Sequence, residues 1–175
     1  MTNDRKWKVL ESEYLAKEPW LTVRKERVEL PNGNQISDYY VLEYPEWVNV
    51  IAITKEKKFV LVRQYRHGLG VTAMELSAGV AEKGESPLIA IQRELLEETG
   101  YGNGNWSEYM QISSNASSTT NIVHCFVATD VEKVSDQQLE DSEDITVHLL
   151  SLDEVKQILI NDEIKQATQV APLWK

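Results

Sequence analysis

The sequence is poor in several residue types whose presence would assign the protein to a class. It has one cysteine in 175 residues, Cys125, so no disulfide can form within the chain, which fits a reducing compartment. Its 18 Lys and Arg residues are outnumbered by 28 Asp and Glu residues, and the net charge is −10. Nucleic acids and anionic membranes would be repelled by such a chain, so we expect neither as the main partner.

Long apolar runs are missing as well. No run approaches the about 20 residues that a transmembrane helix needs. The N-terminal stretch lacks the apolar core of a signal peptide, so we expect a cytoplasmic protein. The length suits one domain with a hydrophobic core of its own, and it leaves room for a small N-terminal extension.

Residues 1–44 have the pattern of a small antiparallel sheet that precedes the main domain. Val28 and Leu30 alternate with charged residues, and the turn sequence PNGN follows them at 31–34. A run of this kind before such a turn predicts a hairpin, whose second strand covers 36–42. We therefore divide the chain into an N-terminal β extension, 1–44, and a main domain, 45–175.

In the main domain, apolar runs alternate with helical patterns. Continuous apolar runs are typical of strands that are buried on both faces. The predicted strands cover 47–54, 59–65, 71–76, 106–112, 122–129 and 145–150. The predicted helices cover 87–99, 152–159 and 164–173. This order of elements predicts an α/β (α+β) fold in which a mixed sheet is sandwiched between helices.

The first helix carries signals for both of its ends. Ser86 is a good N-cap, and Pro87 suits the first helical position because the N–H that proline lacks would be unpaired there. Gly100 can adopt the left-handed conformation that ends a helix. Apolar residues at i, i+3 and i+7 give the helix one buried face. This apolar stripe consists of Leu88, Ile91 and Leu95.

Three carboxylates crowd one face of the same helix. Glu94 and Glu98 lie one turn apart, and Glu97 lies beside them. Like charges at this spacing destabilise a helix by about 0.2–0.5 kcal/mol per pair. A divalent cation would turn the repulsion into coordination, and carboxylate oxygens suit Mg²⁺ or Mn²⁺ rather than Zn²⁺. The alternative is a solvated acidic face on which Arg93 pairs with Glu97.

The spacing of the residues around this helix resembles the signature of the Nudix hydrolases. Five residues separate a glycine from a glutamate, and seven more lead to an Arg-Glu pair, a Glu-Glu pair and a second glycine. The matching residues are Gly79, Glu85, Arg93, Glu94, Leu95, Glu97, Glu98, Gly100 and Tyr101. A chance match at so many specified positions is rare. The resemblance implies a Nudix-type α/β/α sandwich with a mixed central sheet.

The resemblance also implies a reaction and a metal site. Nudix enzymes hydrolyse a nucleoside diphosphate linked to another group, while Mg²⁺, or Mn²⁺ in its place, holds the phosphate oxygens. By motif position, Glu94 and Glu98 are the first-choice metal ligands and Glu97 is the third. The backbone carbonyl of Ala78 is a further candidate ligand. Glu97 and Glu98 are therefore candidate catalytic residues.

Three other motif residues are expected to support this site. The resemblance implies that Arg93 orients Glu94 or Glu97 rather than contacting substrate. Glu85 is expected to hydrogen-bond back to the helix region and to tune the metal ligands. Gly79 is expected to form a glycine turn that passes close to the metal site.

Two strings outside the motif resemble the branch of the family that contains ADP-ribose and nucleotide-sugar pyrophosphatases. The strings are VRQYRH at 62–67 and ELSAG at 75–79, the second with a serine in place of the usual proline. Arg63 and Arg66 are candidates to bind the phosphates of the substrate. Glu75 is a candidate to hold one of these arginines in place. A surface ion pair is the alternative for Arg66.

An acidic segment at 140–144 is a candidate source of one more carboxylate. This branch uses an acidic loop before a late strand to supply a base or a metal ligand, and the segment fits by position. Glu143 is the first choice for this catalytic role, followed by Glu140 or Asp141. A solvated acidic turn is the alternative.

The loop at 113–121 leaves the substrate open within the branch. Many ADP-ribose enzymes carry Ser-Pro-Gly and an acidic residue here, whereas this chain reads SSNASSTTN. We predict Mg²⁺-dependent hydrolysis of the pyrophosphate bond of ADP-ribose or a related nucleotide sugar to a nucleoside monophosphate and a sugar phosphate. The alternatives are another nucleoside diphosphate derivative, such as GDP-mannose or a dinucleotide, and a non-catalytic Nudix-fold ligand sensor. The N-terminal extension resembles one that pairs across dimers, so we expect a homodimer.

Overall fold

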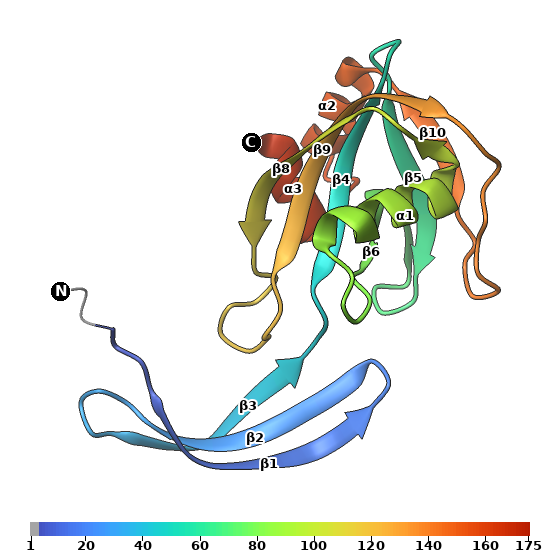
Figure 1. The fold of residues 1–175 in the computed structure, drawn as a ribbon. Coiled ribbons are helices and arrows are strands. Elements are labelled where there is room, and N and C mark those ends of the chain that lie inside the picture. Colours follow the sequence, from blue (N-terminus) through green and yellow to red (C-terminus); the bar gives the residue numbers. More distant parts are fainter. Residues whose placement is uncertain (1–3) are drawn as a thin grey trace. The chain divides into compact units, whose positions relative to one another are not determined.

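The computed structural model describes residues 4–175, which divide into two compact units (Figure 1). The first unit contains the chain up to Tyr44 together with Asn115–Asn121, and the second contains Pro45–Ser114 and Ile122–Lys175. The segment Asn115–Asn121 joins the first unit through backbone hydrogen bonds on both sides of Leu42, whose N–H donates to Ser118 over 2.7 Å. The division expected from the sequence, with a boundary after residue 44, assigned residues 115–121 to the main domain.

The first unit is a three-stranded antiparallel sheet in the order β1-β2-β3. Its strands are β1 (Lys8–Glu18), β2 (Leu21–Glu29) and β3 (Gln35–Glu43). The predicted hairpin is formed by β2 and β3. Its turn is closed by a hydrogen bond of 2.8 Å from the N–H of Leu30 to the carbonyl of Asn34, and Gly33 adopts a φ of +86°.

The strand β1 was not predicted, because its apolar residues follow no alternation and its charges fall on both faces. The charges pair across the strands instead. Arg27 on β2, for example, donates to Glu11 on β1 over 2.6 Å. Exposed pairs of this kind contribute little each, so the strand depends mainly on its backbone ladder with β2.

The second unit is built on a seven-stranded mixed sheet in the order β10-β5-β6-β4-β9-β7, with β8 pairing to β9. The strands are β4 (Trp47–Thr54), β5 (Phe59–Arg66), β6 (Val71–Val80), β7 (Tyr101–Gly102), β8 (Asn105–Ile112), β9 (Val123–Lys133) and β10 (Thr146–Leu150). The pairing of β4 with β9 is parallel, whereas the neighbouring ladders are antiparallel. The helices are α1 (Pro87–Thr99), α2 (Leu152–Ile160) and α3 (Ala167–Trp174). Across residues 4–175, no helix has the length and apolarity needed to cross a membrane.

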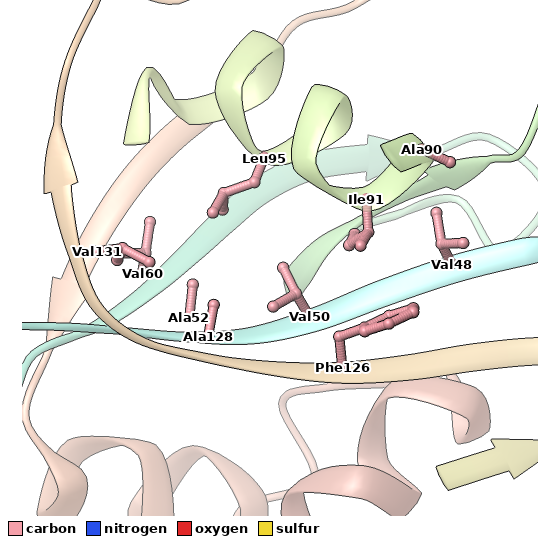
Figure 2. Packing of buried hydrophobic residues seen from close by; sticks show 10 residues of the cluster. All are labelled: Val48, Val50, Ala52, Val60, Ala90, Ile91, Leu95, Phe126, Ala128 and Val131. Carbon is pink, nitrogen blue, oxygen red and sulfur yellow. The ribbon is translucent and has the colours of Figure 1, made fainter. Parts of the chain in front are cut away.

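Helices cover both faces of this sheet, which confirms the predicted α/β/α sandwich. On one face, Ile91 and Leu95 of α1 pack against Val50 and its neighbours in a fully buried cluster (Figure 2). On the other face, Leu61 of β5 packs against Val155 of α2 and other residues of α2 and α3. Val60 of β5 belongs to the first cluster and Leu61 to the second, so successive residues of β5 face opposite layers, as the period of two in a strand requires.

The ends of α1 lie where the sequence placed them. The Ser86 side chain accepts a hydrogen bond from the N–H of Ile89 over 3.4 Å, and Pro87 follows as the first helical residue. Gly100 ends the helix with a φ of +71°, and its N–H donates to the carbonyl of Leu96 over 2.7 Å. Glu94, Glu97 and Glu98 are therefore held on a helix that is fixed at both ends.

The strand β6 changes neighbours halfway along its length. Residues 71–76 pair with β5, and residues 77–80 pair with β4. Beyond this point β4 pairs directly with β5, where Ala52 lies opposite Val60. The exchange brings the second half of β6 against α1 and leaves the backbone N–H of Leu76 at the junction of three strands.

The cysteine is placed so that it reports on opening of the sheet. Cys125 is fully buried on β9, and burial raises the pKa of its thiol to about 11. Because the thiolate is the reactive form, we expect no reaction with an aromatic disulfide reagent at pH 8 in the native protein. One thiol per chain should react in denaturant. Rapid labelling of the native protein would show that β9 is accessible.

Candidate active site

The site is centred on Arg93, which lies on the face of α1 that is turned toward the end of β6. Its Nε and Nη2 donate to the two carboxylate oxygens of Glu85, each over 3.1 Å. Its Nη1 donates to Glu94 over 2.9 Å and to Glu97 over 3.0 Å, and Nη2 also reaches the carbonyl of Val80 over 3.1 Å. These bonds, with that to Glu85 first, raise the pKa of Arg93. One guanidinium thus holds three motif carboxylates.

The carboxylate of Glu94 lies directly against the backbone of Gly79. A Cβ atom at position 79 would overlap all three atoms of the Glu94 carboxyl group. Gly79 is not in a turn, as the sequence suggested, but inside β6, where it pairs with Val48 of β4. Its lack of a side chain is required by the close approach of Glu94 and not by an unusual backbone angle.

Glu98 is the most buried of the motif carboxylates, with 3% of its surface exposed. Its Oε2 accepts a hydrogen bond of 3.2 Å from the backbone N–H of Ala78 on β6. The pKa of Glu98 is raised to about 8, mainly by burial and in smaller part by the nearby charges of Glu94 and Glu143. Burial also raises the pKa of Glu94. Two acidic side chains are thereby held where their charged forms are poorly solvated.

This donor set fits a hard divalent cation. The candidate ligands are all oxygen atoms, and a bound cation would offset the poor solvation of Glu94 and Glu98. Among residues 4–175, no group of three or more Asp, Glu, His or Cys side chains is arranged to hold a metal ion. Mg²⁺ commonly binds to one or two carboxylates and takes its other ligands from water and phosphate, so a partial cage suits it.

Arg66 and Glu75 form the second part of the site. The Nε and Nη2 atoms of Arg66 donate to the two oxygens of Glu75 over 2.8 and 2.5 Å. Glu75 is 2% exposed, whereas 41% of the Arg66 side chain is exposed, so the arginine is accessible and its partner is not. The hydrogen bond to Glu75 is the main cause that raises the pKa of Arg66, and the charge of Glu98 adds to it. Arg66 therefore lies within electrostatic reach of Glu98 on α1.

Arg63 is not brought together with Arg66. The two residues are three apart on β5, so their side chains point to opposite faces of the sheet. Arg63 lies opposite Met74 and lines a cavity of about 520 Å³ that also includes His148, Ile158 and Lys165. The role expected for Arg63 in phosphate binding stays a prediction.

The acidic segment is attached to the end of α1 by two glutamines. Gln137 donates to the backbone carbonyl of Glu98 over 2.7 Å, and the N–H of Gln138 donates to the carbonyl of Glu97 over 2.9 Å. Glu143 acts on the pKa of Glu98, which places it within electrostatic reach of the site. Its own Oε2 accepts a hydrogen bond of 2.9 Å from the N–H of Glu140, whose side chain is exposed.

Three glutamines contact the site although no motif marks them. Gln137 and Gln138 position the acidic segment, and Gln169 of α3 donates to Glu75 over 3.1 Å. Glutamine is common in solvated loops and helices, so its type carries no signal. Contacts between residues this far apart in the chain are visible only after folding.

Two family models match the chain. Residues 43–171 match the NUDIX domain, and residues 7–42 match the nucleoside diphosphate sugar hydrolase N-terminal domain. The chain is 34% identical over 164 residues to the methanol dehydrogenase activator of Bacillus methanolicus, which covers 93% of this chain and 88% of the relative. It is 32% identical over 166 residues to the ADP-ribose pyrophosphatase of Bacillus subtilis (strain 168), which covers 91% and 89%.

Other relatives extend the comparison. The chain is 28% identical over 125 residues to the GDP-mannose pyrophosphatase of Escherichia coli (strain K12), covering 67% of this chain and 65% of the relative. The crystal structure of an ADP compounds hydrolase superposes with a TM-score of 0.84 at 25% identity, covering 97% of this chain and 91% of that chain. The two pyrophosphatases found by sequence and the structure found by its fold are therefore hydrolases of similar kinds of compound by name.

Proposed function

We propose, from the premise that this chain belongs to the Nudix hydrolase family, that it hydrolyses the pyrophosphate bond of ADP-ribose or a related nucleotide sugar. The products are a nucleoside monophosphate and a sugar phosphate. The observation that carries the proposal is an accessible guanidinium, Arg66, which is held by Glu75 and lies within electrostatic reach of the buried carboxylate of Glu98. The activities for which the relatives are named, ADP-ribose pyrophosphatase and GDP-mannose pyrophosphatase, support a substrate with a nucleoside diphosphate group.

Divalent cations are the general requirement of this family, and we propose Mg²⁺ here, with Mn²⁺ as the alternative. Glu94, Glu98 and the carbonyl of Ala78 are the residues that would hold it, and Glu97 is the third carboxylate. When bound, such an ion neutralises charge on phosphoryl oxygens and lowers the pKa of the attacking water. Arg93 and Glu85 keep the acidic side chains in place, and Gly79 leaves room for Glu94.

The chain's own residues bind the phosphates and accept a proton. Arg66 presents its exposed guanidinium to the pyrophosphate oxygens. The buried carboxylate of Glu75 orients this guanidinium through two hydrogen bonds. Water adds its oxygen to one phosphorus, and the bond from that phosphorus to the bridging oxygen breaks. Glu143 is our first choice to accept the proton of the water, with Glu140 or Asp141 as alternatives. Its electrostatic influence on Glu98 supports this choice.

Exchange of Glu143 for glutamine tests its role. Loss of a general base typically lowers kcat by about 10²- to 10⁴-fold, so we expect Glu143→Gln to lose activity in this range while KM changes little. Asp144→Asn, which removes the next carboxylate along the chain, serves as the matched control. If neither Glu143→Gln nor Glu140→Gln lowers the rate, the base lies elsewhere.

A substrate panel tests the function itself. ADP-ribose, GDP-mannose, other nucleotide sugars and dinucleotides are incubated with the enzyme and Mg²⁺ or Mn²⁺, and the phosphomonoester released is measured. We expect ADP-ribose or a closely related nucleotide sugar to be the preferred substrate. Preference for GDP-mannose or a dinucleotide would select the alternative substrate class. Tight binding without any turnover would identify a ligand sensor and would contradict the proposed reaction.

We also propose that the chain is a homodimer formed through the extension at 1–44. In the described part of this unit, large apolar side chains remain exposed on the three strands, directly before β1 and in the turn that follows it. They are Trp7, Val9, Tyr14, Leu15, Trp20, Leu21 and Tyr40. An exposed set of this size supports an association surface. Light scattering after size exclusion should give about twice 20.0 kDa, and a monomer at micromolar concentration would contradict the proposal.

A further inference from the structure

Gln169 is a buried polar side chain with both ends of its amide engaged. It lies on α3 and is 1% exposed. Its Nε2 donates to Oε2 of Glu75 over 3.1 Å, and its Oε1 accepts from the backbone N–H of Leu76 over 2.8 Å. A glutamine is seldom this buried, because each of its polar atoms then needs a partner inside the protein. The arrangement therefore calls for a specific reason.

The bond to Leu76 fixes where Gln169 can point. Leu76 lies at the position where β6 leaves β5 and begins to pair with β4. Its N–H is buried at this junction, and the carbonyl of Gln169 supplies its partner. With the carbonyl held by the backbone of β6, the amide nitrogen of the same group is directed at the neighbouring residue, Glu75.

Glu75 is consequently held from two sides. Its Oε1 accepts from Nε of Arg66, and its Oε2 accepts from both Nη2 of Arg66 and Nε2 of Gln169. The Arg66 side chain is partly exposed and long, so a carboxylate held by Arg66 alone could turn together with it. The bond from Gln169 ties the carboxylate to the buried interior instead.

We propose that Gln169 is a positioning residue which, through Glu75, fixes the direction of the Arg66 guanidinium toward the phosphates of the substrate. This inference rests on the proposed function of the site. It gives a role in the site to α3, which packs on the face of the sheet opposite to α1 (Figure 1). The coupling crosses the sheet at the junction of β4, β5 and β6.

A double-mutant cycle with Arg66 tests the proposal. Gln169→Met keeps the size of the side chain and removes both hydrogen bonds. Loss of a partner that orients a functional group commonly costs about 10- to 100-fold in activity, so we expect kcat/KM to fall in this range, mainly through KM. In an Arg66→Ala background, the same change should have almost no further effect. An equal fold-change in both backgrounds would overturn the proposal.

A matched control separates positioning from general damage to α3. Thr168→Val alters the neighbouring buried residue, whose hydroxyl accepts a hydrogen bond of 3.2 Å from Gln166, and leaves Glu75 untouched. We expect this variant to lose some stability and to keep its KM. If Gln169→Met does not fold, Gln169→Asn takes its place, since it keeps the amide but draws it away from Glu75. A KM that rises as much in Thr168→Val as at position 169 would contradict the inference.

A measurement without substrate keeps the inference independent of the proposed reaction. The Nε–H of Arg66 donates to Glu75 over 2.8 Å, so this proton should exchange slowly with water. The exchange rate is measured by NMR on the ¹H–¹⁵N signal of this group. We expect Gln169→Met to remove this protection and Thr168→Val to retain it. Unchanged protection in Gln169→Met would overturn the inference. Inactivity of the wild-type protein on every substrate would refute only the proposed function.

Discussion

Replacement of Glu98 by glutamine is expected to abolish most of the activity and to preserve the fold. The amide has nearly the same shape but no negative charge, so it would bind a divalent cation much more weakly. Removal of one group that stabilises the transition state typically costs about 10²- to 10³-fold in kcat, and we expect Glu98→Gln to lose at least this much. Because Glu98 is 3% exposed, the change also removes a poorly solvated carboxylate. The melting temperature should therefore stay the same or rise.

A loss of kcat without a loss of melting temperature distinguishes a role in the site from general damage to the fold. Steady-state kinetics and thermal unfolding are measured on the same preparation. Glu56→Gln, at an exposed position in the turn between β4 and β5, changes the net charge equally and should alter neither quantity. Turnover by Glu98→Gln close to that of the wild type, with Mg²⁺ present, would remove Glu98 from the metal site.

Replacement of Gly79 by alanine is expected to displace Glu94. The new Cβ would occupy the space of the Glu94 carboxyl group, so the helix or the side chain must move away from β6. A misplacement of about 1 Å at a catalytic group can cost about 10²-fold in rate, and overpacking destabilises a fold by about 1–3 kcal/mol. We expect Gly79→Ala to lose both activity and stability in these ranges.

Gly68 offers a matched control for this change. It lies in the loop between β5 and β6, and an added Cβ there meets no atom within 4 Å. Gly68→Ala should keep the stability and the kinetics of the wild type. If Gly79→Ala behaves like Gly68→Ala, the close contact between Gly79 and Glu94 is not required for the site.

Local signals accounted for the helix that carries the motif. Ser86, Pro87 and Gly100 each act through their own backbone or side chain, so their positions in the sequence were enough to place the ends of α1. The continuous apolar runs likewise indicated where the main buried strands lie, because each run is a local feature of the sequence. The resemblance implied that Glu75 holds either Arg63 or Arg66 but did not say which, and in the structure Glu75 pairs with Arg66 through both of its oxygens.

Features that depend on distant parts of the chain were not predicted. Gly79 was expected in a turn, whereas it is needed within β6 because a carboxylate from α1 packs on it. The strand β1 carries no alternation and forms by pairing with β2. Gln169 meets Glu75 only because α3 returns to the sheet 94 residues later in the chain. The separation of Arg63 from Arg66 could have been predicted, since residues three apart on a strand face opposite sides.

The central claim is that this chain hydrolyses a pyrophosphate bond at the site formed by α1 and β6. The most direct test is hydrolysis of ADP-ribose in ¹⁸O-labelled water with Mg²⁺, followed by mass spectrometry of the products. We predict equal amounts of AMP and ribose phosphate, with one labelled oxygen in the phosphate of one product, and no reaction with a chelator or in Glu98→Gln. ADP-ribose and nucleotide sugars that stay intact, or a free nucleobase among the products, would contradict the claim.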